Sequence, residues 1–141
     1  MNNISSTRRE GGAAATAAAI LYCVWGVLHL GLGAVMAASG LDPRGELEAE
    51  SLMFFLCAIV FGAQAIAVGL VLNRRNDLFG YWLNLVVLGA IDIAFLLVLV
   101  RPGHVDLAGG LSGPVVWAAA AVLSTIALRN GRRREVRPDR A

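Results

Sequence analysis

The chain has 141 residues, 57% of them hydrophobic and 16% charged, with a formal net charge of +2. A soluble domain of this size cannot bury that much apolar surface in one core, whereas a lipid bilayer solvates it. The composition therefore excludes an ordinary soluble domain. The charged residues lie almost entirely between the apolar stretches, so they give no reason to expect a nucleic-acid partner.

The first apolar stretch runs from Ala13 to Ala38 and predicts a transmembrane helix over residues 13–38. It exceeds the roughly 20 residues that cross the hydrocarbon core of a bilayer. Arg8 and Arg9 precede it, as basic residues precede the apolar part of a secretory signal peptide. That apolar part has only about 7–15 residues, so we expect this longer helix to be retained.

Two further apolar stretches predict helices over about residues 48–72 and 77–100. The link between them, Asn73 to Asp77, is so short that the two helices must form an antiparallel hairpin. Asn76 or Asp77 can cap the second helix of this hairpin, because short polar side chains accept hydrogen bonds from the first free backbone N–H groups.

The fourth apolar stretch, Val115 to Leu128, is the shortest. It reaches spanning length only if residues 111–129 are all helical. We expect this helix to open at Gly113-Pro114 and to end at Asn130-Gly131, because Gly and Asn favour helix C-termini.

Together these elements predict an all-α protein: a bundle of four transmembrane helices in an up-down-up-down arrangement. Residues 1–12 would form a cytoplasmic N-terminal segment, residues 13–129 the transmembrane domain, and residues 130–141 a basic cytoplasmic tail.

The arginines predict which side of the membrane each end occupies. All 12 basic residues are Arg, and four spans divide them into ten on one side and two on the other. Basic residues concentrate on the cytoplasmic side, so both termini are expected there, in the plasma (inner) membrane of a bacterial cell. The cytoplasmic set is Arg8, Arg9, Arg74, Arg75, Arg129, Arg132, Arg133, Arg134, Arg137 and Arg140; the outer set is Arg44 and Arg101.

Asp92 is the candidate site residue with the strongest physical argument. A carboxylate at mid-bilayer costs at least about 2.5–3.5 kcal/mol, so it must face the bundle interior, find a partner or carry a proton. At a helical rise of about 1.5 Å per residue, Asp92 lies roughly 12 Å and His29 roughly 13 Å from the outer ends of their helices. We therefore expect Asp92 and His29 to interact across the first and third helices.

Other residues of the apolar stretches are weaker candidates. Gln64 and Asn84 could hold helices together by hydrogen bonds, or could continue a polar path from Asp92 toward the cytoplasm. Trp25 either packs in the bundle or lines a ligand cavity, and Gly26 lies next to it on a stripe of small residues. Gly89 would leave room beside Asp92 for a partner side chain or a water molecule.

A resemblance adds one expectation. The segment Trp25-Gly26-Val27-Leu28-His29-Leu30-Gly31-Leu32-Gly33 opens a predicted four-helix chain and resembles the first helix of small uncharacterised bacterial membrane families, broadly DoxX-like. The resemblance covers that helix and the overall layout. It implies the four-helix architecture and assigns no role to any residue.

The sequence leaves three functions open. No metal-ligand spacing, nucleotide-binding loop or nucleophile–base pair is present, so we expect neither a metal nor a cofactor and more readily a non-enzymatic protein than an enzyme. The leading hypothesis is a helper subunit or a binder of a lipophilic molecule. The alternatives are a small proton-coupled transporter or channel that uses Asp92 with His29, and a membrane redox or quinone-binding protein. The expected partners are the lipid bilayer and, for transport above all, further copies in a homo-oligomer or a larger membrane complex.

Overall fold

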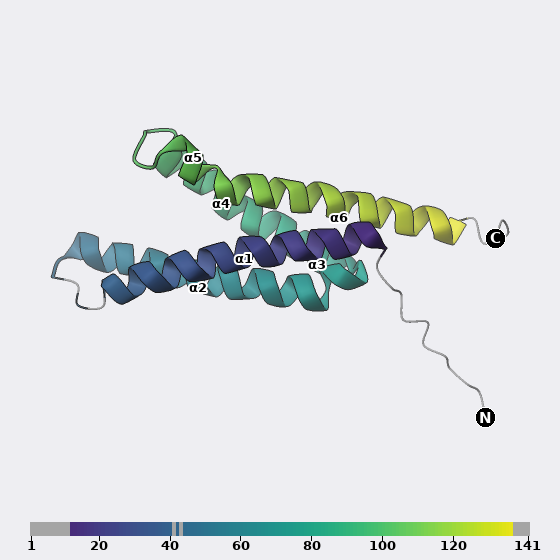
Figure 1. The fold of residues 1–141 in the computed structure, drawn as a ribbon, viewed down its shortest axis with the longest axis horizontal. Coiled ribbons are helices and arrows are strands. Elements are labelled where there is room, and N and C mark those ends of the chain that lie inside the picture. The colour runs from purple at the N-terminus through teal and green to yellow at the C-terminus, as the bar shows by residue number, and fades with distance from the viewer. Residues whose placement is uncertain (1–11, 41, 43, 137–141) are drawn as a thin grey trace, which may run out of the picture.

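The computed structural model describes residues 12–40, 42 and 44–136, and over this part of the chain it contains helices and their connections only. Four helical segments are long and apolar enough to cross a membrane, and they run up, down, up and down (Figure 1). The predicted all-α four-helix bundle is confirmed. The spans are Ala13–Ser39, Glu46–Arg75, Leu78–Val100 and Leu107–Arg133.

The first, second and fourth spans are mainly single α-helices, whereas the third is built from four pieces. Short 3₁₀ and π-helical segments are labelled η. The elements are α1 (Ala13–Ser39), α2 (Glu46–Val71), η1 (Asn73–Arg75), α3 (Leu78–Leu83), η2 (Asn84–Leu88), α4 (Gly89–Phe95), η3 (Leu96–Val100), α5 (Leu107–Gly110) and α6 (Ser112–Val136).

The first three spans begin and end within three residues of the predicted bounds. Asp77 caps α3, because its carboxylate accepts a hydrogen bond of 2.9 Å from the backbone N–H of Gly80. Asn76, the other candidate cap, instead takes a left-handed conformation with φ 57° in the turn before α3.

The fourth helix, α6, begins within one residue of its predicted start, but its predicted end was wrong. A separate turn, α5, precedes α6, and α6 continues through Asn130 and Gly131 to Val136. Gly and Asn cost a helix only about 0.5–1 kcal/mol, which tertiary contacts outweigh. Here the side chain of Asn76 donates a 3.2 Å hydrogen bond to the carbonyl of Ala127 and packs against Gly131. Most of the predicted terminal segments, residues 1–11 and 137–141, lie outside the described residues.

The third span turns one row of residues toward the bundle interior. Gly80, Asn84, Leu88 and Asp92 are all buried, at a constant spacing of four. On a regular α-helix of 3.6 residues per turn, such a row drifts by about 40° at each step. The wider turns of the π-helical segment η2 absorb part of this drift. Asn84 and Asp92 therefore face the same interior.

α1 and α2 form the closest helix pair of the bundle. A Cβ atom at Gly26 would lie 2.5 Å from the carbonyl oxygen of Gly62, and one at Gly62 would lie 2.6 Å from the carbonyl oxygen of Gly26. Gly33 lies equally close to α2, where a Cβ atom would be 2.7 Å from the carbonyl oxygen of Phe55. Small residues at these positions let the two backbones touch, as in other membrane helix pairs.

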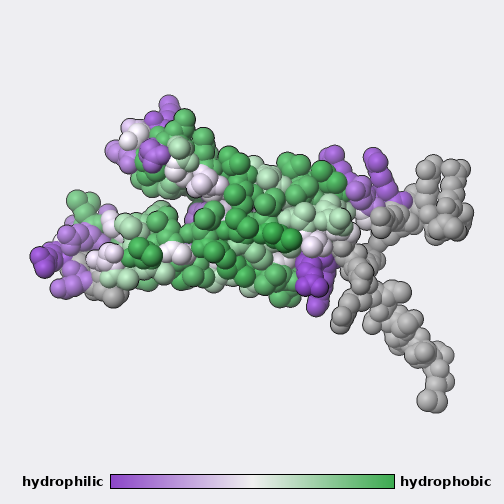
Figure 2. Space-filling view, in the orientation of Figure 1, coloured by the Kyte–Doolittle hydropathy of each residue, from purple (hydrophilic) through white to green (hydrophobic). Residues whose placement is uncertain are grey.

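The bundle has two unlike halves. In the closed half, at the end that carries Arg74, α3 and η2 contact both α2 and α6. In the open half, at the end that carries Arg44 and Arg101, α4 and η3 make their main contacts with α6 and α5 and move away from α2. Beyond the contact between α1 and α6, the outer end of the pair α1–α2 and the segments η3 and α5 consequently separate, and Figure 2 shows a notch between them.

The surface matches a lipid environment along the whole length of the bundle. Large apolar side chains are exposed on every span, including Val27, Val60, Val98 and Val115. Hydrophilic residues gather at the two ends, with an apolar belt between them (Figure 2). A water-soluble monomer rarely exposes so large a continuous apolar surface. The chain has the architecture of a multi-pass membrane protein.

Candidate functional site

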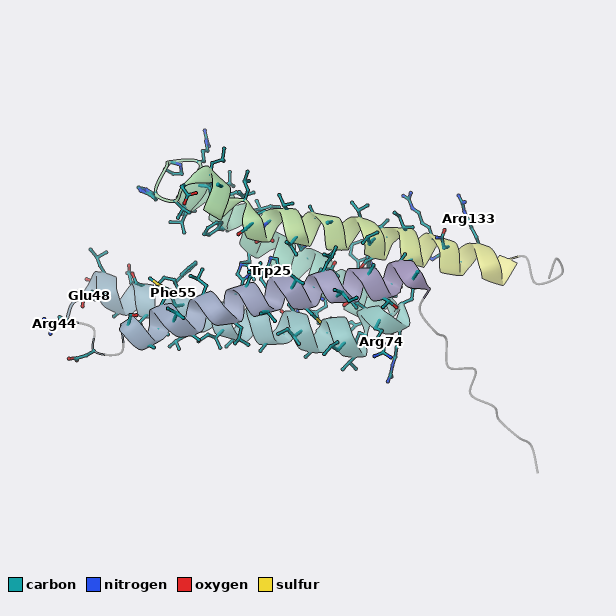
Figure 3. All side chains as sticks on the ribbon, viewed as in Figure 1. Trp25, Arg44, Glu48, Phe55, Arg74 and Arg133 are labelled. Atoms are coloured by element: carbon teal, nitrogen blue, oxygen red, sulfur yellow. The ribbon has the colours of Figure 1, made fainter. Side chains whose placement is uncertain are left out.

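The candidate site is centred on Asp92, which α4 carries in the interior of the bundle. Its side chain is only 2% exposed. The indole N–H of Trp25, from the middle of α1, donates a 3.0 Å hydrogen bond to its Oδ2 atom. Trp25 is itself fully buried beside α4 (Figure 3). The carboxyl group therefore faces the interior of the bundle, as the cost of burying it in lipid requires.

His29 lies one turn further along α1 and is half-buried. Its ring stacks on the indole of Trp25, with the two centroids 3.6 Å apart and an interplanar angle of 17°. Its Nδ1 atom lies 2.9 Å from the carbonyl oxygen of Trp25. A carbonyl oxygen can only accept, so Nδ1 carries the proton, and the Nε2 atom of the neutral ring presents a lone pair.

Gly113, in the first turn of α6, brings Asp92 and His29 together. A Cβ atom on Gly113 would lie 2.9 Å from Cε1 and 3.4 Å from Nε2 of His29, and 3.5 Å from Oδ1 of Asp92. The imidazole and the second carboxyl oxygen thus face the same small space beside the backbone of α6. Among the described residues they share no direct hydrogen bond, and Trp25 joins them instead by its N–H, its ring and its carbonyl group.

Gln64 and Asn84 belong to a different cluster, in the closed half. The amide of Gln64 donates a 3.0 Å hydrogen bond to Oδ1 of Asn84, and the amide of Asn84 donates one of 3.0 Å to Oδ1 of Asn73. This amide chain ties α2, η1 and η2 together. The described residues show no hydrogen bond between the amide chain and Asp92, so it does not continue from the carboxyl group as a bonded path.

Three buried polar atoms near Trp25 have no hydrogen-bond partner among the described residues: Tyr22 Oη, Ser124 Oγ and Trp117 Nε1. Tyr22 and Trp117 pack in the same core cluster as Trp25. The indole of Trp117 fills the space beside Gly89, where a Cβ atom would lie 2.5 Å from its ring. The space beside Gly26 is likewise filled, by the backbone of α2 at Gly62. The two glycines thus serve close packing.

Sequence reasoning did not select Gly113, Asn73 or Trp117 for this interior. The sequence pattern predicts a helix start at Gly113 and a link that includes Asn73. A polar residue in a short link between two apolar helices is a usable signal for Asn73, because a hairpin brings such a link against the bundle. Nothing in the local sequence marks Gly113 as a neighbour of Asp92.

The comparisons with known proteins add no relative. No protein-family model, no curated protein and no solved structure matches this chain. In the described part of the chain, no three His, Cys, Asp or Glu side chains gather as a metal site would require. The site must therefore be interpreted from its own geometry.

Proposed function

We propose that this protein is a non-enzymatic membrane protein that binds a lipophilic molecule in the notch of its open half, with the polar group of that molecule at His29 and Asp92. One observation carries the proposal. A buried carboxyl group and a half-buried imidazole meet beside Gly113, where α6 begins against α1, and the open half beyond them has a notch (Figure 2). Ligand sites are typically apolar clefts with a few such polar groups that fix orientation.

The hydrogen-bonding atoms of His29 and Asp92 restrict which polar group the ligand can carry. Nδ1 of His29 is engaged by the carbonyl of Trp25, so Nε2 of the neutral ring is an acceptor. A hydroxyl group at the end of an apolar molecule can donate to it and lie against Oδ1 of Asp92. Helical spacings of three, four and seven residues continue the His29 face of α1 to Leu32, Gly33 and Met36. Leu32 and Met36 are exposed, so they can line the apolar part of the same notch.

A matched pair of probes tests the proposal. In a Trp82→Phe background, we expect a ring-brominated 4-dodecylphenol to quench saturably the fluorescence of the two remaining tryptophans, Trp25 and Trp117, which share one core cluster. The ring-brominated dodecylbenzene, which lacks the hydroxyl, should bind about threefold to tenfold more weakly, the value of one hydrogen bond. Titration of both probes into the detergent-solubilised protein measures this difference.

His29→Phe keeps a ring over Trp25 and removes the acceptor, so it should abolish the preference for the phenol. His104→Phe is the matched control, because His104 is exposed in the loop between η3 and α5. Equal quenching by the two probes, or an unchanged preference in His29→Phe, would refute the proposal.

Proton-coupled transport is the second candidate, and hydroxyl groups in the interior favour it. Among the described residues, the hydroxyls of Tyr22 and Ser124 are buried without a partner, and the hydroxyl of Tyr81 lies 3.1 Å from that of Thr125 in the closed half. Proton carriers of this kind use an intramembrane carboxyl group. Reconstituted vesicles loaded with a pH-sensitive dye would show a proton flux that Asp92→Asn abolishes. Absence of flux in the unaltered protein would reject transport.

Both termini lie on the cytoplasmic side in this proposal. The end of the bundle at η1 and the end of α6 carries Arg74, Arg75, Arg129, Arg132 and Arg133, against Arg44 and Arg101 at the other end. Such an excess marks the cytoplasmic face. Green fluorescent protein fused to either terminus should be fluorescent in cells, because it folds in the cytoplasm. A fusion that is fluorescent at one terminus and not at the other would contradict the arrangement.

A further inference from the structure

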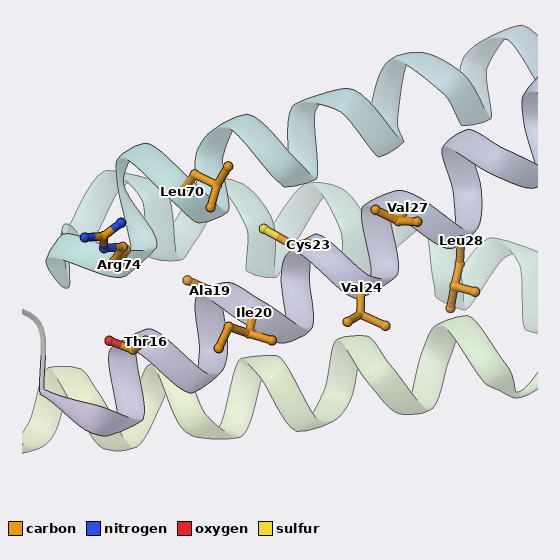
Figure 4. Close-up of a pocket in the computed structure, with 9 residues that line it drawn as sticks. All are labelled: Thr16, Ala19, Ile20, Cys23, Val24, Val27, Leu28, Leu70 and Arg74. Carbon is orange, nitrogen blue, oxygen red and sulfur yellow. The ribbon is translucent and has the colours of Figure 1, made fainter.

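A second apolar groove runs along α1, on the face turned away from Trp25 and His29. It encloses about 610 Å³ and lies between the first half of α1 and the end of α2 (Figure 4). Its walls are apolar except at one end. The residues that line it are Thr16, Ala19, Ile20, Cys23, Val24, Val27, Leu28, Leu70 and Arg74.

The polar end of the groove is basic. Arg74 lies at the same end as Thr16, and Figure 4 shows both at one edge of the view, with apolar side chains extending away from them. Asp77 is the acidic side chain that the structure describes at this end of the bundle, and it caps α3. The exposed guanidinium of Arg74 is thus available to an anion at the membrane surface.

The length of the groove matches one leaflet. Thr16 and Leu28 are twelve residues apart on α1, a distance of roughly 18 Å at 1.5 Å per residue. Half of a hydrocarbon core of about 30 Å is close to that length. An occupant that starts at Arg74 therefore reaches the middle of the bilayer, as an acyl chain of one leaflet does.

We propose that this groove binds an anionic phospholipid from the leaflet at the basic end of the bundle. Its phosphate lies at Arg74, and one acyl chain follows α1 past Cys23 and Val24 toward Leu28. Zwitterionic lipids fit less well, because their ammonium group meets arginines here and the described acid, Asp77, is engaged by the backbone of α3. The site is separate from the notch and does not depend on its ligand.

Native mass spectrometry of the full chain tests the proposal. The protein is released from micelles that contain dioleoyl-phosphatidylglycerol and dioleoyl-phosphatidylcholine in equal amounts. We expect the unaltered protein to retain the anionic lipid preferentially. Arg74→Gln should reduce that preference about fivefold, the effect of one arginine near a lipid surface.

Two matched controls separate the groove from general charge and from general shape. Arg75→Gln removes the same charge at the neighbouring residue, which does not line the groove, and should leave the preference unchanged. Val24→Trp fills the groove and should displace the lipid, whereas Val60→Trp, at an exposed position of α2, should not.

Several outcomes would overturn the proposal. An equal loss of the preference for the anionic lipid in Arg74→Gln and Arg75→Gln would show that the basic end as a whole attracts the lipid. Retention of lipid by Val24→Trp would place the lipid elsewhere. In a Cys57→Ser variant in vesicles, oxidative cross-linking of Cys23 between two chains would show that a second copy covers the groove.

Discussion

The closed and open halves of this bundle are built from the same four spans, but the spans pack together in one half and separate in the other. In the closed half, amide side chains from α2, η1 and η2 bond one another, and the third span fits between its neighbours. In the open half, the third span leaves α2, and no residue of η3 is buried. Hydrogen bonds between helices hold the closed half together, whereas in the open half the helices separate beyond the buried carboxyl group of Asp92. One bundle thus combines a tightly joined end with an end that opens.

The largest expected effect comes from forcing apart the α1–α2 contact, which both halves share. Gly62→Leu places a side chain against two backbone atoms, 2.6 Å from the carbonyl oxygen of Gly26 and 2.8 Å from the backbone nitrogen of Leu30. Backbone cannot yield as a flexible side chain does, so the free energy of unfolding should fall by about 3 kcal/mol. Unfolding by dodecyl sulfate in mixed micelles measures the loss. Gly31→Leu is the control, since no atom lies within 4 Å of a Cβ at that position.

The second-largest loss of stability is expected from a change at Trp25, which lies where the two halves meet. Trp25→Phe removes the N–H that Asp92 accepts and leaves a small cavity in the core. We expect a loss of about 2 kcal/mol in the free energy of unfolding, because a buried acceptor without its donor is costly. Trp82→Phe, the same change at an exposed tryptophan, should cost less than about 0.5 kcal/mol. Equal losses in the two variants would contradict the assigned role of Trp25.

The amide chain of the closed half is expected to have a smaller effect. Asn84→Leu breaks its hydrogen bonds to Gln64 and Asn73, and each such bond in a membrane contributes about 0.6 kcal/mol. The predicted loss is therefore about 1 kcal/mol. In a double-mutant cycle, Gln64→Leu should cost less in the Asn84→Leu background than in the unaltered protein. Strictly additive losses would show that the two amides stabilise the bundle independently.

The smallest effect is expected in the open half. Leu32 is 56% exposed, so Leu32→Ala should change the free energy of unfolding by less than about 0.5 kcal/mol while weakening binding of the bromophenol probe. Leu88→Ala makes the same change at a fully buried position and should cost about 2 kcal/mol or more. A large loss of stability in Leu32→Ala would show that the notch is closed by packing in the membrane.

The helical spans were predictable because their signal is local. Apolar length alone located the first three spans to within three residues, and the polar link predicted a cap at Asn76 or Asp77, of which Asp77 is the observed cap. The fourth span was less predictable at its C-terminal end, since contacts from Asn76 accompany α6 past Asn130 and Gly131. The π-helical segments that flank α4 have no signal in residue type, because any apolar sequence can form them.

The candidate site was only partly accessible to sequence reasoning. Depth along the helices brought Asp92 and His29 to one level, and the structure places both beside Gly113. Depth could not show that Trp25 would stand between them, or that Gln64 and Asn84 would bond to Asn73 instead of continuing toward the carboxyl group. The roles of these residues in binding or transport remain predictions for the experiments above.

The sequence by itself determined that four helices are long and apolar enough to cross a membrane, and it marked the basic end. Both properties belong to single stretches of chain. The tertiary structure alone decided which polar groups meet, and that the bundle opens at one end. Helices that are apolar on all sides gain nothing from facing one another rather than lipid, so their rotation is set by close packing and by hydrogen bonds between distant residues.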